Sequence, residues 1–293
     1  MKRQQMLNAI DWILPPNIFR LLTYYRLKAL WFALAHHEAL SANKALFNRH
    51  RGERCFILCN GPSVKQQDIR PLKNEVVFSV SSGYLHPDYS EIRPQYHCIP
   101  QLTFGKITPE IAVNWFHEMD EQLGGAELFL DHQEWSLVQE QSLFPERDVH
   151  FVCMGRNHFP RISANIENLA GILPRVQSVP ILAIMIALYM GMREIYLIGT
   201  EHDWFIKKEY KYFFEPDLLK GMDIAVGKDG ALINNSLLDQ LPAVNRLWSQ
   251  YRAVNNIAKA HDVVIYNATA GGMLDEFERV CLGDVLKQKK KMP

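Results

Sequence analysis

The amino-acid sequence predicts an α/β fold: three layers around a mainly parallel, Rossmann-like sheet. From residue 54 onward, short apolar runs alternate with longer helical segments, and this alternation is typical of such folds. The apolar run Cys55–Cys59 leads directly into the turn residues Asn60–Ser63, as a buried parallel strand does. The segment Pro180–Met190 is apolar nearly all round, which indicates a helix buried against the sheet.

Seven strands are expected, each a short apolar run bounded by turn residues. They are Cys55–Cys59, Val76–Val80, Tyr96–Ile99, Glu127–Leu130, His150–Cys153, Glu194–Ile198 and Val263–Tyr266. The last long helix is expected over Asp239–Ala260. These elements predict one Rossmann-like nucleotide-binding domain over residues 51–285, followed by a basic tail over residues 286–293.

Residues 1–50 are predicted to form a separate helical segment. An amphipathic helix over residues 1–14 ends at Pro15-Pro16, and a second helix is expected over about Ile18–Ala45. Its charged residues leave no uncharged run of the ~18 residues that a spanning helix needs. Basic residues beside Trp, Phe and Tyr suit a helix that lies in a membrane interface. Packing on the chain's own domain or on a second subunit is the alternative.

Charge and cysteine content narrow the compartment and the partners. The chain is neutral overall, but residues 1–54 hold nine Lys and Arg against three acids, a net charge of +6. Such a start favours an anionic surface. Five cysteines without a C-x-x-C indicate reduced thiols, and no signal peptide is evident. We therefore expect a cytoplasmic protein peripheral to the inner membrane, with membrane contact through residues 1–50, no nucleic-acid partner, and a homo-oligomer as an open alternative.

Polar residues gather where the expected strands end or the buried helix begins. Carboxyl ends of parallel strands meet at one edge of the sheet, so these residues predict a single nucleotide or donor site. The candidates are Asn60, Gly61, Pro62, Ser63, Ser81, Ser82, Ser178 and Thr200. Glycine lets the backbone approach a ligand closely, Asn offers a donor and an acceptor, and Ser can cap a helix or bond a phosphate. A plain strand-to-helix turn is the alternative for the first of these loops.

Glu201, His202 and Asp203 are the catalytic candidates, because they form the densest set of titratable groups in the chain. His202 could act as a general base or acid that a neighbouring carboxylate orients. A carboxylate could instead hold a divalent cation against phosphates. A solvent-exposed polar loop is the alternative.

Further candidates lie downstream. Tyr210 and Tyr212 could donate to a phosphate from a mobile loop, and Asn267 and Thr269 precede the adjacent glycines Gly271-Gly272 after the last strand. The sequence contains no G-x-G-x-x-G, no Walker motif, no G-x-S-x-G and no zinc-ligand spacing, so a Rossmann dehydrogenase and a P-loop kinase are disfavoured. No metal site is predicted from these residues alone.

Four blocks in order carry a family resemblance: FILCNGPSV, VFSVSSGYL, REIYLIGTEHDWF and IYNATAGG. Together they resemble bacterial proteins with a domain similar to 6-hydroxymethylpterin diphosphokinase. The first and third blocks are also similar to sialyltransferases of glycosyltransferase family 42, whose fold is a GT-A variant. The resemblance covers roughly residues 54–275.

The sialyltransferase resemblance implies a CMP-activated acidic sugar as donor. It implies that Asn60, Gly61 and Ser63 border the nucleotide phosphate or ribose and that Ser81 and Ser178 help seat the donor. Tyr210 or Tyr212 would stabilise the leaving phosphate, where negative charge develops. The chain departs from that family in having Cys59 before the loop and no histidine between His202 and His261. His202, a carboxylate, or a retaining mechanism without such a base would then replace the family's base.

The diphosphokinase resemblance implies ATP and Mg²⁺ instead, with Asp203 and Glu201 as metal ligands. A non-catalytic nucleotide-binding scaffold in glycan assembly is a third alternative, which would not need His202. The basic aromatic start favours a membrane-peripheral glycosyltransferase of surface-polysaccharide synthesis that acts on a glycan or lipid-linked acceptor. No cofactor is predicted beyond the nucleotide sugar, with Mg²⁺ left open.

Overall fold

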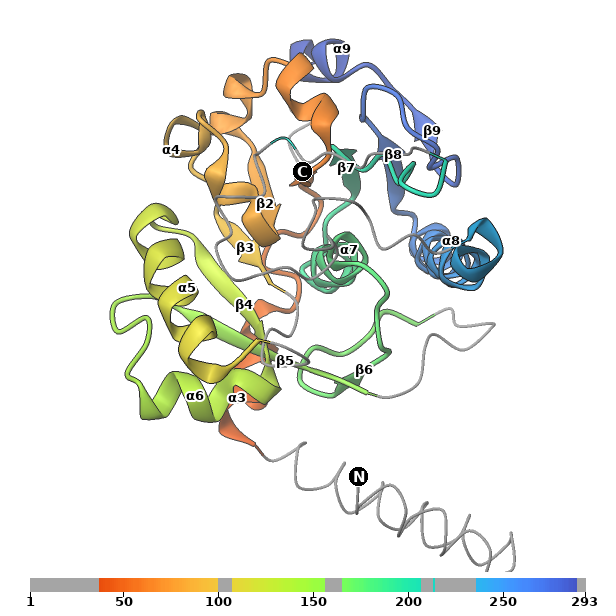
Figure 1. Ribbon diagram of the computed structural model, residues 1–293. Helices are drawn as coiled ribbons and strands as arrows, with labels where there is room; N and C mark the ends of the chain where they lie inside the picture. The colour runs from red at the N-terminus through yellow and green to blue at the C-terminus, as the bar shows by residue number, and fades with distance from the viewer. Residues whose placement is uncertain (1–36, 100–106, 156–164, 207–212, 214–235, 289–293) are drawn as a thin grey trace, which may run out of the picture.

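The computed structural model of the chain describes residues 37–99, 107–155, 165–206, 213 and 236–288 (Figure 1). The first predicted N-terminal helix and residues 18–36 of the second, the tyrosines Tyr210 and Tyr212, and the end of the basic tail lie outside these residues. Within the described part, no helix has both the length and the apolar character that crossing a bilayer requires.

The described residues form a nine-stranded sheet in the order β6-β5-β4-β3-β2-β1-β7-β8-β9 (Figure 1). All neighbouring strands pair in parallel. The strands are β1 Arg54–Leu58, β2 Val76–Val80, β3 Tyr96–Cys98, β4 Glu127–Asp131, β5 Val149–Met154, β6 Ile172–Leu173, β7 Glu194–Ile198, β8 Val264–Asn267 and β9 Glu278–Arg279. All seven predicted strands are present, so the predicted α/β class with a parallel sheet is confirmed. The unpredicted strands β6 and β9 have two residues each, too few to leave an apolar pattern.

The direction in which the chain adds strands reverses between β1 and β7. From β1 the chain builds outward through β2 to β6, and it then returns to place β7 on the other side of β1. In the paired register Leu58 of β1 lies opposite Ile198 of β7. The loops after these two strands therefore start side by side at the carboxyl edge of the sheet, where open α/β sheets bind ligands.

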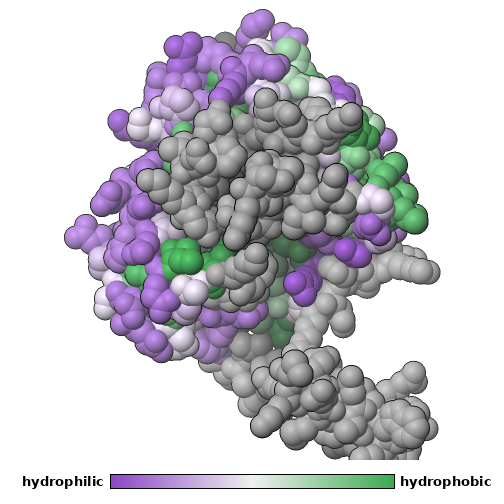
Figure 2. Space-filling view, viewed as in Figure 1, coloured by the Kyte–Doolittle hydropathy of each residue, from purple (hydrophilic) through white to green (hydrophobic). Residues whose placement is uncertain are grey.

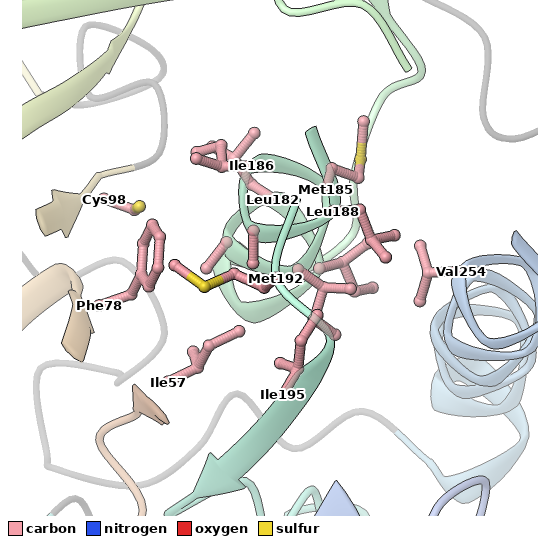
Figure 3. Packing of buried hydrophobic residues seen from close by; sticks show 14 of the residues in the cluster. Ile57, Phe78, Cys98, Leu182, Met185, Ile186, Leu188, Met192, Ile195 and Val254 are labelled. Atoms are coloured by element: carbon pink, nitrogen blue, oxygen red, sulfur yellow. The ribbon is translucent and has the colours of Figure 1, made fainter. Parts of the chain in front are cut away.

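One face of the sheet is covered by α7 Val179–Tyr189 and, beside it over β8, by α8 Leu237–Ala260. Every residue of α7 from Pro180 onward is buried, because the helix packs on β1, β2, β3 and β7 on one side and on α8 on the other. Figure 3 shows this arrangement, with Ile57 and Phe78 of the sheet on one side of α7 and Val254 of α8 on the other. The predicted helices Pro180–Met190 and Asp239–Ala260 are confirmed to within two residues at each end. The predicted helix over about Ile18–Ala45 is wrong in its described part, because His37 has an extended backbone and only the short α3 Glu38–Ser41 and η1 Ala42–Leu46 follow it.

The remaining helices are mostly short; they cover the opposite face, except η1, whose Leu46 packs in the cluster of the α7 face. They are α3 Glu38–Ser41, η1 Ala42–Leu46, η2 Pro62–Gln66, η3 Arg70–Asn74, η4 Ser81–Leu85, α4 Tyr89–Ile92, α5 Pro109–Gln122, η5 His132–Glu134, α6 Trp135–Glu140 and α9 Leu282–Lys287. Two apolar clusters lie under them, one between α5, α6 and the β4–β5 region and one between η3, α4, α9 and the β1–β7 region. The outer surface over α4 and α5 is mostly hydrophilic (Figure 2). The sheet is thus the middle of three layers.

The last part of the predicted N-terminal segment packs on this domain. Leu40 and Leu46 are fully buried, and the Asn43 amide donates to the carbonyls of Phe151 (2.7 Å) and Leu169 (2.9 Å). These contacts attach residues 38–50 to the sheet beside β5. All five cysteines are free thiols, three of them buried, as the odd count predicted.

Candidate functional site

The two loops after β1 and β7 are joined by main-chain hydrogen bonds. The amide of Cys59 donates to the carbonyl of Ile198 at 2.8 Å, and the amide of Gly61 donates to that of Gly199 at 3.0 Å. The parallel ladder between β1 and β7 therefore continues past the ends of both strands. This continuation brings Asn60–Ser63 and Thr200–Asp203 to one place, as predicted from the convergence of strand ends.

The amides of the Asn60–Ser63 loop are largely used inside the protein. Gly61 donates to Gly199, Pro62 has no N–H, and the Ser63 amide donates to Oε1 of Glu201 at 2.7 Å. A carboxylate oxygen thus occupies the position at which a phosphate oxygen would accept from Ser63. A ligand at this loop would be met by side chains rather than by a cradle of free backbone N–H groups.

The Glu201 side chain is held between two glycines. It is 3% exposed, and a Cβ added at Gly61 would fall on its carboxylate. On the main-chain side, a Cβ added at Gly272 would overlap the backbone of Glu201. The Glu201 carbonyl accepts from the amides of Met273 (2.7 Å) and Leu274 (3.3 Å). Glycine is required at position 61 by space alone, because its φ of −68° suits any residue.

Several buried polar atoms of these loops have no hydrogen-bond partner within the described residues, and three of them bear on ligand binding. These three are Oδ1 of Asn60, Oγ of Ser63 and Oε2 of Glu201. A buried polar atom without a partner costs about 1–3 kcal/mol, so such a cluster needs an explanation. Two of the three atoms can only accept, which fits a ligand that brings hydroxyl or amino donors. The Thr200 hydroxyl lies against the thiol of Cys59. Burial raises the pKa of this thiol to about 12.

His202 lies in an aromatic surround. Its ring centroid is 5.6 Å from that of Trp204 and 6.2 Å from that of Trp248, and its Nε2 is 2.7 Å from the hydroxyl of Tyr251. Burial lowers the pKa of His202 to about 4, against the opposing effect of the Asp203 carboxylate. The imidazole is therefore neutral at pH 7. Its backbone is left-handed, with a φ of 49°, which turns the side chain toward α8.

Tyr251 is the site residue that sequence reasoning missed. Glu201 or Asp203 was predicted to orient His202. The hydrogen-bond partner of its Nε2 is instead Tyr251, a fully buried residue of α8 that lies 49 residues away in the chain. A tyrosine at helical spacing within an apolar face looks like an ordinary core residue, so the sequence carried no signal for it. Trp248 is oriented from outside the site, because its indole N–H donates to Asp275 at 2.8 Å.

The predicted serines lie at the same edge. Ser81 and Ser82 begin η4 directly after β2, and a Cβ at Gly83 would stand 3.6 Å from Oδ1 of Asn60, so η4 adjoins the first loop. Ser178 is the N-cap residue of α7, but its side chain makes no capping bond. Because α7 runs against the strand direction, its positive N-terminal end lies at the carboxyl edge of the sheet.

Asn267 and Thr269 have their side chains engaged within the protein. The Asn267 amide accepts from the Thr269 N–H (3.0 Å) and donates to the carbonyl of Leu274 (2.9 Å). The Thr269 hydroxyl accepts from the Thr200 amide at 3.0 Å. Both side chains therefore brace the loop behind Glu201, and a role of these residues in nucleotide binding stays a prediction. Tyr210 and Tyr212 lie outside the described residues.

Two buried carboxylates, Glu201 and Asp203, stand at the site. In the ranges that the structure describes, no three His, Cys, Asp or Glu side chains are grouped so that they could hold a metal ion.

Comparisons with known proteins were made for the fold and for the sequence. No protein-family model matches the chain, and no curated protein matches it significantly. Among solved structures, two single-residue variants of the sialyltransferase CST-II in complex with CMP match with TM-scores of 0.47 and 0.46 at 14% and 15% identity. CST-II in complex with a trisaccharide acceptor and CMP matches with a TM-score of 0.42 at 18% identity. Each match covers 78% of this chain and 86% of the other. The resemblance to the diphosphokinase family stays a prediction.

Proposed function

We propose that this chain is a glycosyltransferase that takes an acidic sugar from a CMP-activated donor. The observation that carries the proposal is the group of unpartnered buried atoms on Asn60, Ser63 and Glu201 at the point where the sheet reverses direction. A nucleoside carries ribose hydroxyls, and cytosine carries an exocyclic amine. These groups can donate hydrogen bonds to the unpartnered acceptor atoms. The single phosphate of CMP matches one helix N-terminus, that of α7, with the uncapped Ser178 beside it.

His202 is our candidate for the base that takes the proton from the acceptor hydroxyl. The role requires the tautomer in which Nε2–H donates to Tyr251, because Nδ1 is then free to accept. The Asp203 charge favours the imidazolium that forms. Tyr210 and Tyr212 remain our candidates for stabilising the departing phosphate, and Phe213, which follows them, donates its amide to the carbonyl of Asn60 at 3.1 Å.

Glu201 and Asp203 also support the runner-up, an ATP- and Mg²⁺-dependent diphosphokinase, since carboxylates are the ligands that Mg²⁺ prefers. Our proposal limits the contact with the cytoplasmic face of a membrane to the part of residues 1–50 that precedes Glu38, because residues 38–50 pack on the sheet. It keeps a surface-glycan or lipid-linked acceptor as the partner. A non-catalytic scaffold would keep nucleotide binding but would not depend on His202.

Nucleotide binding separates the first two candidates. CMP at a hundredfold excess over Kd should raise the free energy of unfolding by about 2.7 kcal/mol, measured by thermal or urea unfolding. UMP, which lacks the exocyclic amine, should stabilise less. Stabilisation only by ATP with Mg²⁺ would replace our proposal with the diphosphokinase. No effect of any nucleotide would remove both.

Replacement of His202 tests the base. His202→Ala should lower turnover by about 10²-fold or more while CMP affinity stays near that of the wild type. Tyr251→Phe is the matched variant, because it removes only the hydroxyl on Nε2 and should lower turnover by a smaller factor. Turnover at the wild-type rate in His202→Ala would show that another group is the base or that none is needed.

A further inference from the structure

The geometry points to Arg279 as a positioning residue for Glu201, and the inference rests on the proposed function only where it concerns nucleotide affinity. Arg279 belongs to the two-residue strand β9, where it pairs with Asn267 of β8. It is not among the nucleotide-binding or catalytic residues predicted from the sequence. Its guanidinium does not touch the site but ends on the loop behind it.

The guanidinium binds four carbonyls of that loop. One terminal nitrogen, Nη1, donates to Gly271 (2.6 Å) and Thr269 (3.4 Å), and Nη2 donates to Gly272 (2.8 Å) and Leu274 (3.1 Å). Gly271 and Gly272 both have left-handed backbones, with φ of 90° and 80°, and their carbonyls both accept from this one side chain. A planar fork of donors suits such a set of acceptors, and the single ammonium of lysine does not.

The loop passes this constraint on to Glu201. Gly272 is pressed against the Glu201 backbone so closely that no Cβ fits between them. The amides of Met273 and Leu274 donate to the Glu201 carbonyl, and Thr269 accepts from the amide of Thr200. Main-chain contacts on both sides thus fix the backbone from which the Glu201 side chain projects.

The constraint ends at the first loop. With its backbone fixed, Glu201 places Oε1 on the Ser63 amide at 2.7 Å and leaves Oε2 without a partner beside Gly61. Arg279 thereby sets the position of this carboxylate, and with it the register between the two ligand-facing loops. The path from the guanidinium to Ser63 runs through main-chain hydrogen bonds and one side chain.

The test compares Arg279→Lys and Arg279→Gln with Arg252→Gln in the full chain. Arg252 is the matched control, because its side chain is 68% exposed and pairs with one carboxylate, that of Glu276. Amide hydrogen exchange should accelerate about tenfold or more at Met273, Leu274 and Ser63 in both Arg279 variants, and not in the control. Exchange in β1 and α7 should stay unchanged.

Calorimetry then measures CMP affinity, which should fall about five- to tenfold in the Arg279 variants with the control unaffected. Unchanged exchange at the three amides would overturn the inference, as would acceleration spread equally over α7. A wild-type protein that does not bind CMP would refute the proposed function alone, since the exchange measurement needs no ligand.

Discussion

Gly61→Ala is expected to lower the free energy of unfolding by about 2–4 kcal/mol and to abolish nucleotide binding. The new methyl group would occupy the position of the Glu201 carboxylate. Glu201 would have to move away from the Ser63 amide. The variant would therefore lose a buried hydrogen bond to the carboxylate, and the side chains around position 61 would be overpacked. Urea unfolding and calorimetry with CMP measure the two effects.

A double-mutant cycle shows whether the collision is the cause. Glu201→Ala removes the carboxylate, so Gly61→Ala should cost much less in that background than in the wild type. Gly272→Ala with Glu201→Ala is the matched pair. At Gly272 the added methyl meets the main chain of Glu201, so shortening that side chain gives no relief. Equal costs of Gly61→Ala in both backgrounds would show that Glu201 does not limit the space.

A loss of stability in mild acid is expected from His97. This residue of β3 is fully buried, and its Nδ1 is 2.7 Å from Oγ of Ser79. Burial lowers the pKa of His97 to about 3, whereas the unfolded chain titrates near 6.5. Between these values the unfolded state binds the extra proton, so stability is complete above about pH 6.5 and falls as the pH falls. The loss should reach about 2 kcal/mol at about pH 5.

His97→Gln keeps a hydrogen-bonding side chain but cannot titrate. Urea unfolding from about pH 7 to about pH 5 should therefore show a shallower decline in the variant than in the wild type, by about 2 kcal/mol over this interval. His117→Gln, at an exposed position of α5, should leave the slope unchanged. Parallel declines in wild type and His97→Gln would mean that the pKa of His97 is the same in the folded and the unfolded state.

The sheet was predictable because its strands are buried on both faces. Continuous apolar runs such as Cys55–Cys59 and Glu194–Ile198 leave a pattern that depends little on partners far away in the chain. The convergence of Asn60–Ser63 with Thr200–Asp203 followed from the parallel topology. Strand β9 has no such pattern, because its two residues are exposed. It is held by backbone pairing with β8 and by the bonds of the Arg279 side chain to the loop after β8.

The roles of single side chains were less predictable, because they depend on which partner folding supplies. The Asn60–Ser63 loop has the composition of a phosphate loop, yet its Ser63 amide is taken by Glu201. Asn267 and Thr269 are predicted to bind a nucleotide, and in the structure their side chains make hydrogen bonds within the loop that follows β8. Hydroxyl and amide groups satisfy backbone or ligand equally well, and only the folded geometry decides between them.

The position of β1 between β2 and β7 has a consequence for the newly made chain. Its edge toward β2 can pair early in synthesis, but the opposite edge waits for residues that emerge much later. Ser63 and Glu201, which meet across that seam, are 138 residues apart. Until β7 has been synthesised, β1 has an unpaired edge that is prone to aggregation. The nascent chain then also has the first of the two binding loops without the second. A ligand that contacts both loops would therefore bind only after synthesis is complete, and it would stabilise the pairing of β7 with β1.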